Sequence, residues 1–243
     1  AILVELMLTT KDKLFTRDDV TSFTFDEQVS ACFDDMIFRS IPSYQTVQEF
    51  IIKQIARHPQ FPARIYDIGC STGSLLEALI SYLPTEQISQ THLVGVDASQ
   101  PMIDRAQAKL IGTHAQLVCA PANDIEYEPS DIIILNYVLQ FLPRKQRDAL
   151  LATLYRSLKP GGLLFLSEKI SCSAHTTELY YDFKRDNGYS EKEISNKRQA
   201  LNNVLVEDSL ATHQDRLTTL GFEDVTVWLT HFNFSSIIAR KPL

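Results

Sequence analysis

The chain has 243 residues, of which 44% are hydrophobic, and a formal net charge of −7. This length and composition suffice to bury the core of one α/β domain of ordinary size. The acidic balance argues against direct nucleic-acid binding, because phosphate binding requires clustered lysine and arginine residues. No apolar run approaches the length of a membrane span, and the apolar opening of residues 1–6 lacks the basic flank of a signal peptide.

The spacing of cysteines and histidines argues against a metal site and against a structural disulfide. The four cysteines, at positions 32, 70, 119 and 172, form no Cys-x-x-Cys pair, and no histidine stands at zinc-ligand spacing. We therefore expect no metal and reduced thiols in a cytoplasmic protein. Cys70 has no neighbouring histidine to activate it, so we expect it to pack in its loop rather than act as a nucleophile.

Residues 7–60 are expected to form an N-terminal arm followed by a helix. The arm mixes charged residues with several phenylalanines and shows no clear period. We expect one or two short helices in it, packed over a pocket or a partner subunit. After a turn at Pro42, apolar residues at helical spacing from Val47 to Ile55 predict a helix over residues 44–56.

Strand, loop and helix alternate through residues 64–170, the predicted ligand-binding core. The expected strands cover residues 64–68, 92–97, 115–119, 131–135 and 163–167. The expected helices cover residues 74–82, 101–110 and 145–158, and a turn at residues 159–162 leads into the fifth strand. This alternation predicts a mostly parallel sheet with right-handed crossovers and helices on both faces.

Residues 171–221 form the least regular segment, with one expected helix that is rich in basic residues. They follow the carboxyl side of the sheet, where open α/β folds bind their ligands, so we interpret them as a lid or substrate wall. Residues 225–229 and 235–239 predict an antiparallel pair within the closing segment 222–243. With no repeat and no low-complexity linker, we expect a single domain over residues 7–243.

The stretch Asp67–Gly73 carries the clearest local motif. An apolar strand ends in an acid, and a glycine-bearing turn leads directly into a helix. Gly69 and Gly73 permit positive φ and the close approach of a ligand to the backbone, and the helix start offers free N–H groups. The pattern Asp-x-Gly-x-x-x-Gly differs from the Gly-x-Gly-x-x-Gly of dinucleotide folds. It favours a nucleoside ligand such as S-adenosyl-L-methionine.

Polar residues follow each of the next strands. Asp97 is placed to accept hydrogen bonds from ribose hydroxyls, and Asp124 with Ile125 could bind adenine. Asn136 would face the reactive end of the ligand, and Asp67 would hold its ammonium group or orient the loop. Each of these acids and amides also has a structural interpretation, as a helix cap or a turn former.

Arg198 in the lid points to an anion. A sulfonium ligand is already cationic, so an arginine directed at the site implies a carboxylate that it would hold with two hydrogen bonds. Lys184, Arg185, Lys197 and Arg39 could add to the positive field. The alternative is a solvated basic face of a helix.

The lid and the C-terminal region hold the most specific motifs of the chain. They are Asp182-Phe183-Lys184-Arg185, Asn187-Gly188-Tyr189-Ser190-Glu191, Lys197-Arg198 and Phe232-Asn233-Phe234. Further motifs are Phe25-Asp26-Glu27, Met36-Ile37-Phe38-Arg39-Ser40-Ile41-Pro42-Ser43-Tyr44, Tyr66-Asp67-Ile68-Gly69-Cys70-Ser71, Leu135-Asn136-Tyr137, Leu139-Gln140-Phe141-Leu142 and Ser167-Glu168-Lys169. Together they resemble the class I S-adenosylmethionine-dependent methyltransferases, and more narrowly the carboxy-S-adenosyl-L-methionine synthase family.

The resemblance implies a Rossmann-like sheet of seven strands with an antiparallel last strand. It implies conversion of S-adenosyl-L-methionine and prephenate to carboxy-S-adenosyl-L-methionine and phenylpyruvate, for wobble-uridine (cmo5U) modification of tRNA by a homodimeric enzyme. S-adenosyl-L-methionine, its carboxylated form or S-adenosylhomocysteine would be bound by Tyr44, Gly69, Cys70, Ser71, Asp97, Ala98, Asp124, Ile125, Asn136 and Arg198. Arg198 would neutralise the new carboxylate, with Tyr44 orienting it.

The chain departs from the family pattern at a few positions. Ser43 stands where the family usually has glycine, and the stretch 170–181 is shorter and more polar than the family helix. Leu229 and His231 replace an aromatic residue and a thiol. These changes leave the predicted cofactor residues intact but weaken the inference that prephenate is the donor.

Two further hypotheses remain open from the sequence. One is an ordinary methyltransferase that acts on a small acidic molecule, which Arg198 would hold. The other is a cofactor-binding subunit without its own turnover. Direct tRNA methylation ranks last, because an acidic chain offers a poor track for phosphates.

Overall fold

The computed structural model describes residues 10–16, 20–58 and 62–243. The opening segment 1–6 and the predicted start of the domain at residue 7 lie outside the described residues. The strands are β1 (Arg64–Ile68), β2 (His92–Asp97), β3 (Gln116–Cys119), β4 (Ser130–Asn136), β5 (Leu158–Lys169), β6 (Glu223–His231) and β7 (Phe234–Arg240). The α-helices are α1 (Glu27–Ser40), α2 (Tyr44–Ala56), α3 (Ser74–Tyr82), α4 (Thr85–Ile88), α5 (Gln100–Lys109), α6 (Arg144–Ser157), α7 (Ala174–Asp186), α8 (Glu191–Ala200) and α9 (Leu210–Leu220). Short 3₁₀ turns are η1 (Leu14–Thr16), η2 (Ala122–Asp124) and η3 (Leu139–Phe141).

The seven strands form one sheet in the order β3-β2-β1-β4-β5-β7-β6. Strands β1 to β5 pair in parallel, and β7 runs antiparallel to both β5 and β6. The predicted mostly parallel sheet with an antiparallel closing pair is therefore confirmed. The strand order reverses between β1 and β4, and open α/β sheets bind ligands at such a switch point, outside the carboxyl ends of the strands.

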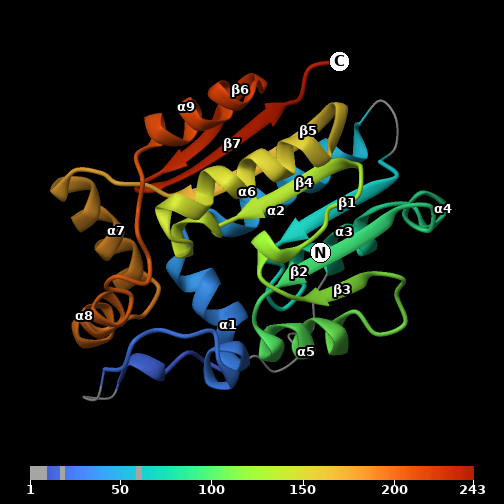
Figure 1. Ribbon diagram of the computed structural model, residues 1–243. Helices are drawn as coiled ribbons and strands as arrows, with labels where there is room; N and C mark the ends of the chain where they lie inside the picture. Colours follow the sequence, from blue (N-terminus) through green and yellow to red (C-terminus); the bar gives the residue numbers. More distant parts are fainter. Residues whose placement is uncertain (1–9, 17–19, 59–61) are drawn as a thin grey trace.

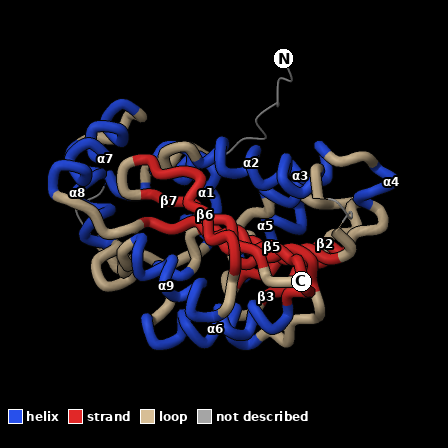
Figure 2. Tube along the Cα trace, turned by 90° about the horizontal axis from the view of Figure 1, so that it is seen from above, coloured by secondary structure: helices blue, strands red, loops and turns tan. Residues whose placement is uncertain are grey.

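Helices cover both faces of the sheet (Figures 1 and 2), with α2 and α3 on one face and α6 and α9 on the other. On β4, Ile132 and Ile134 belong to the core with α2 and α3, whereas Ile133 and Leu135 belong to the core with α6 and α9. All four side chains are fully buried. Because successive side chains of a strand point to opposite faces, such a continuous apolar run requires a layer on each side. No helix among the described residues is long and apolar enough to span a bilayer.

Helices α7 and α8, on the left of Figure 1, and α1, at its lower centre, lie beyond the carboxyl ends of the parallel strands. The Asp26 side chain caps α1 by accepting a hydrogen bond from the Val29 backbone N–H at 3.0 Å. Ser190 and Glu193 form a capping box at the start of α8. These local signals fix where the arm and lid helices begin, and the helices then close over the switch point.

The predicted elements between residues 64 and 158 are confirmed, with ends that differ by at most one residue. The turn predicted at residues 159–162 is wrong, because β5 continues through them. Gly161 adopts a φ of 76° and donates its N–H to the Lys241 carbonyl at 2.9 Å, so the chain bends without leaving the sheet. The arm and the lid are also more regular than predicted, since α1 has 14 residues and residues 171–221 contain three helices.

Candidate functional site

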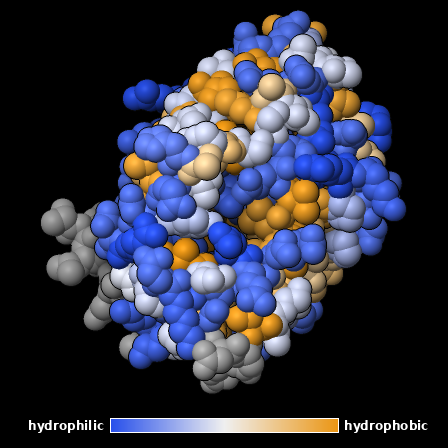
Figure 3. Space-filling view, turned by 90° about the vertical axis from the view of Figure 1, so that its left-hand side faces the viewer, coloured by the Kyte–Doolittle hydropathy of each residue, from blue (hydrophilic) through white to orange (hydrophobic). Residues whose placement is uncertain are grey.

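A cavity of about 450 Å³ lies at the switch point between β1 and β4, a size typical of small-molecule sites. Its walls come from the carboxyl ends of β1, β2 and β4, from α1 and the start of α2, and from the lid. Most of its surface is apolar. Figure 3 views the molecule from the lid side, where hydrophobic patches lie among hydrophilic residues. Seven of the ten predicted binding residues line the cavity: Tyr44, Gly69, Cys70, Ser71, Asp97, Ala98 and Asn136.

The glycine-bearing turn after β1 is held against β2 by its own backbone. The N–H groups of Gly69 and Cys70 donate to the Val96 carbonyl at 2.7 and 3.0 Å. Gly69 has a φ of 72°, and a Cβ there would lie 2.4 Å from the Val138 side chain. Glycine is therefore required at position 69 by both the backbone angle and the space. Gly73 then caps α3 in a left-handed conformation.

The buried carboxylate of Asp67 and the half-buried carboxylate of Asp97 form the acidic end of the cavity. Asp97 accepts hydrogen bonds from the backbone N–H groups of Ser71 at 3.0 Å and Ser99 at 2.9 Å. Burial raises the pKa of Asp97, and burial together with the charge of Asp97 raises the pKa of Asp67 to about 7. A cationic ligand would stabilise both charged forms. This end of the cavity therefore fits the ammonium and sulfonium groups of S-adenosylmethionine better than it fits a phosphate.

The loop after β4 is anchored by a buried glutamate. Glu168 accepts hydrogen bonds from the backbone N–H groups of Val138, Leu139 and Gln140, at 3.1, 2.7 and 3.0 Å. Burial outweighs these hydrogen bonds and raises the pKa of Glu168 to about 8. The Asn136 Oδ1 atom just before this loop is buried and has no hydrogen-bond partner among the described residues. A ligand donor such as an ammonium group would satisfy it.

Tyr44 enters the cavity from the first turn of α2. Its hydroxyl accepts a hydrogen bond from Gln48 at 3.2 Å, and its ring centre lies 6.2 Å from that of Tyr137. Burial raises the pKa of the Tyr44 hydroxyl, so it stays protonated and available as a donor. The preceding Ser43 has a left-handed φ of 59°, and its Oγ lies 2.8 Å from His231 Nδ1. Two positions at which the sequence is expected to depart from the family pattern thus contact each other.

Comparisons with known proteins identify the family. A model described as "Methyltransferase domain" matches residues 65–162. The carboxy-S-adenosyl-L-methionine synthase of Chromohalobacter salexigens is 43% identical over 242 residues, covering 95% of this chain and 88% of the relative. Those of Haemophilus ducreyi and Shewanella oneidensis are 40% and 42% identical, over 95% and 92% of this chain and 98% and 95% of theirs. The chain belongs to the carboxy-S-adenosyl-L-methionine synthase family.

Solved methyltransferase structures share the fold of this synthase family member. Magnesium protoporphyrin IX methyltransferase from Synechocystis, with bound SAH, superposes with a TM-score of 0.60 at 16% identity, over 85% of this chain and 87% of that one. Human N-acetylserotonin methyltransferase in complex with SAM gives a TM-score of 0.56 at 15% identity, over 89% of this chain and 56% of that one. The predicted class I methyltransferase fold is confirmed.

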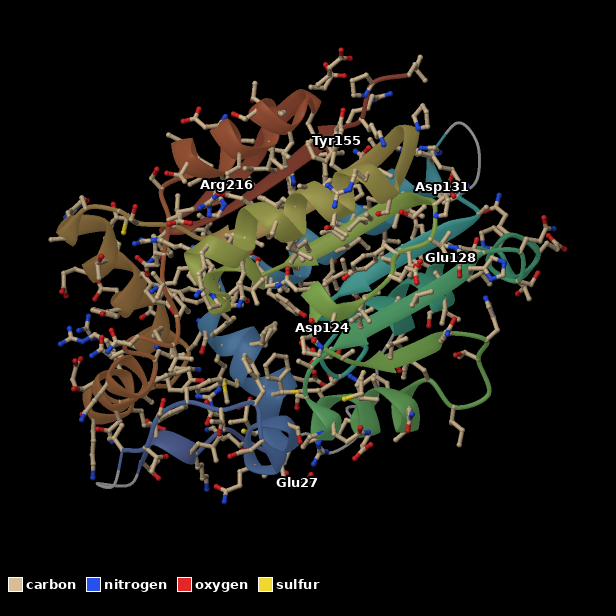
Figure 4. All side chains as sticks on the ribbon, in the orientation of Figure 1. Glu27, Asp124, Glu128, Asp131, Tyr155 and Arg216 are labelled. Carbon is tan, nitrogen blue, oxygen red and sulfur yellow. The ribbon has the colours of Figure 1, made fainter. Side chains whose placement is uncertain are left out.

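Three of the predicted binding residues do not line the cavity of this synthase. Asp124 is exposed and Ile125 half-buried, although Ala120, Pro121 and Ala122 just before them line the cavity. Figure 4 shows Asp124 on the side of the sheet that faces α1. Binding of adenine by Asp124 and Ile125 stays a prediction, in which the adenine would lie at the edge of the cavity.

Arg198, the third, is exposed on α8, whereas the neighbouring Lys197 is buried and lines the cavity. The sequence predicts the arginine at the site and a supporting role for the lysine. The spacing of Ile194, Lys197 and Leu201 is the signal that could have shown which side of α8 faces inward. The catalytic role of Arg198 stays a prediction.

The sequence predicts no role for some residues of the site. Glu168 and Lys169 belong only to a motif, and Tyr180 only to the lid, although Lys169 and Tyr180 line the cavity and Glu168 holds one of its loops. No local pattern indicates such roles, because they depend on the pairing of β5 with β4. In the described part of the chain, no cluster of three or more histidine, cysteine or carboxylate groups could hold a metal ion.

Proposed function

We propose that this protein converts S-adenosyl-L-methionine and prephenate to carboxy-S-adenosyl-L-methionine and phenylpyruvate. The observation that carries the proposal is the 43% identity, over 95% of the chain, to a carboxy-S-adenosyl-L-methionine synthase. In the proposed reaction, prephenate loses carbon dioxide and its ring hydroxyl group as the ring becomes aromatic. The carbon dioxide forms a new bond to the methyl carbon of the sulfonium substrate. That carbon gives up one proton, which leaves with the hydroxide as water.

The acidic end of the cavity supports the orientation of S-adenosyl-L-methionine. Asp97 would accept hydrogen bonds from the ribose hydroxyls, and the Gly69–Ser71 backbone would contact the amino-acid moiety. Asp67 and the unpaired Asn136 Oδ1 would hold the ammonium group. Asp124 and Ile125 would bind adenine at the cavity edge. The methyl carbon then lies toward Tyr44 and the lid.

Water exclusion is the main contribution that the arm would make. Phe23, Phe25, Phe33 and Phe141 line the cavity, and Phe25 packs edge-on against Phe23 and Phe141 with ring centres 5.0 Å apart. An apolar wall keeps water from the carbon dioxide released next to the methyl carbon. Holding the two reacting groups together in a dry pocket accounts for much of the expected rate enhancement.

A homodimer would bring Arg198 to the reaction. Since Arg198 is exposed on its own subunit, we propose that it reaches the cavity of a second copy and neutralises the new carboxylate. The exposed Phe38 on α1 and Leu179 on α7, with 60% and 40% of their surface accessible, offer apolar contacts for such a partner. The four reduced cysteines support a cytoplasmic location, where the product would serve wobble-uridine modification of tRNA without this protein binding RNA.

Mass spectrometry of the products tests the proposal. Incubation with S-adenosyl-L-methionine and prephenate should yield a sulfonium product heavier by one carboxyl group, together with phenylpyruvate. Arg198→Ala should lose the carboxylated product but still bind S-adenosylhomocysteine, and Gln199→Ala, an exposed neighbour on the same helix, should behave as wild type. If the wild-type protein leaves the sulfonium unmodified, the proposal fails. Release of S-adenosylhomocysteine with a methylated acid would instead select a methyltransferase.

A further inference from the structure

Three lysines gather at the lid end of the cavity. Lys169 and Lys197 line it. Lys184 does not line it, but its Nζ lies 5.5 Å from the ring centres of both Tyr180 and Tyr189. Lys184 and Lys197 are only 4% and 5% exposed. Burying an ammonium group is costly unless an anion lies close to it, so this arrangement requires an explanation.

The acids of this region do not balance the three lysines. Asp12 lies 4.0 Å from Lys197 Nζ, and its carboxylate is shared with a tyrosine hydroxyl. Glu207 pairs with Lys169. Within the described residues, Lys184 forms no ion pair. Burial is the main cause that lowers the pKa of Lys197 to about 8, and burial and the two other lysines lower the pKa of Lys184. The lid end of the cavity thus has more lysines than acidic partners.

We propose that Lys169 and Lys197 bind the carboxylate that the carboxyl donor keeps as it becomes an α-keto acid. This inference rests on the proposed function and assigns part of the site for the second substrate. The other carboxylate of the donor leaves as neutral carbon dioxide, and a lysine bound to it would stabilise the charged ground state more than the transition state. The lysines therefore suit the carboxylate that stays charged throughout.

The two ends of the cavity then have opposite charges that match two different substrates. At the strand ends, Asp67 attracts the cationic amino-acid end of the sulfonium substrate, and Asp97 accepts hydrogen bonds from its ribose. The lysines attract the anionic side chain of the donor at the lid. Each substrate is repelled from the other's subsite, so the charge distribution sets which groups meet between them.

A purely structural role is the competing explanation. Lys197 Nζ donates a hydrogen bond to Ser40 Oγ at 2.8 Å, and the Tyr180 hydroxyl donates to the Ser40 carbonyl at 3.0 Å. These contacts connect the lid to α1 and would brace it even without a substrate. The test must therefore separate donor binding from folding and from binding of the sulfonium ligand.

Steady-state kinetics of Lys197→Met and Lys169→Met at saturating S-adenosyl-L-methionine provide this separation. Each variant should raise the KM for prephenate by about tenfold or more, the loss expected when a charge-assisted hydrogen bond is removed. The Kd for S-adenosylhomocysteine, measured by calorimetry, should change less than about twofold. Lys197→Arg should restore most of the donor affinity, and Lys145→Met, on the exposed face of α6, should match wild type. An unchanged donor KM, or an equal loss of both affinities, would overturn the proposal.

Binding of phenylpyruvate keeps the two proposals distinguishable. This product retains only the carboxylate assigned to the lysines, so it should bind the wild-type protein in the presence of S-adenosylhomocysteine and bind Lys197→Met at least about tenfold more weakly. If the wild-type protein forms no carboxylated product but shows this difference, the reaction is refuted and the anion subsite stands. Equal binding to both proteins, or no binding to either, refutes the subsite. Lys169→Met, at a half-buried position, repeats the comparison if Lys197→Met does not fold.

Discussion

Replacement of Glu168 by glutamine tests how the loop after β4 is held. The carboxylate accepts three backbone N–H groups, at distances between 2.7 and 3.1 Å. Glutamine has the same shape but presents an NH₂ group in place of one oxygen, so at least one of these N–H groups would face another donor. A buried N–H without a partner costs about 1–3 kcal/mol. We expect the free energy of unfolding of Glu168→Gln to fall by about that amount below about pH 4.5, where the glutamate is protonated in both the folded and the unfolded protein.

The same substitution changes how stability depends on pH. The pKa of Glu168 is raised from its ordinary value of 4.5 to about 8, because burial outweighs the hydrogen bonds. The folded protein therefore keeps this proton at pH values where the unfolded chain has released it. The resulting stabilisation is full below about pH 4.5 and is lost as the pH rises through about 8. The variant has no such proton, so its stability should decline less than that of wild type over this range.

Urea unfolding provides the assay, with the single tryptophan as its probe. Trp228 stacks on Phe50 with ring centres 3.7 Å apart, so its fluorescence reports on the packing of α2 against the sheet. Glu223→Gln, which changes an exposed carboxylate, is the matched control and should shift stability by less than about 0.5 kcal/mol. If Glu168→Gln unfolds at the wild-type midpoint at every pH, the three hydrogen bonds do not hold the loop.

Three further predictions concern the ligands. Asp97→Asn should weaken S-adenosylhomocysteine binding about 10- to 100-fold in calorimetry, because it removes hydrogen bonds to a charged acceptor; an unchanged Kd would contradict the ribose role. Gly69→Ala should lower the Tm and prevent ligand binding, since its Cβ would lie 2.4 Å from the Val138 side chain at a φ of 72°. Adding Val138→Ala should restore only the part of the Tm loss that the clash causes, because the unfavourable φ remains. Prephenate affinity should fall as the pH rises through about 8, where Lys197 loses its proton. An affinity that stays constant up to about pH 10 would refute this prediction. So would an equal fall in affinity in Lys197→Arg, whose side chain keeps its charge.

The sequence allowed the core of the fold to be predicted because its signals are local. The β4 run Ile132–Leu135 is apolar at every position, which is typical of a strand covered on both faces, and the structure covers it in that way. The turn from Asp67 to Gly73 likewise follows from residue types alone. Such features depend on backbone preferences and side-chain alternation, which act over a few residues.

The lid could not be predicted to the same depth, because its residues gain their roles through distant contacts. Lys197 and Arg198 are adjacent and both basic, and only the packing of α8 against the arm decides which of them faces the cavity. In the sequence, Glu168 looks like an ordinary strand residue. Its role depends on the pairing of β5 with β4, which places its side chain next to the loop that follows β4. The failed turn at residues 159–162 has the same cause, since the C-terminal residues supply the hydrogen bonds that keep Gly161 in the sheet.

The contact between Ser43 and His231 has a consequence for exchanging segments between relatives. A serine at a left-handed position is tolerated here while its hydroxyl meets the imidazole at 2.8 Å. A segment 36–44 with glycine at position 43 would leave the His231 ring without this partner. A β6 strand without His231 would leave the serine in an unfavourable conformation unaided. We therefore expect chimaeras that exchange the two positions together, 188 residues apart in the chain, to be more stable than those that exchange only one of them.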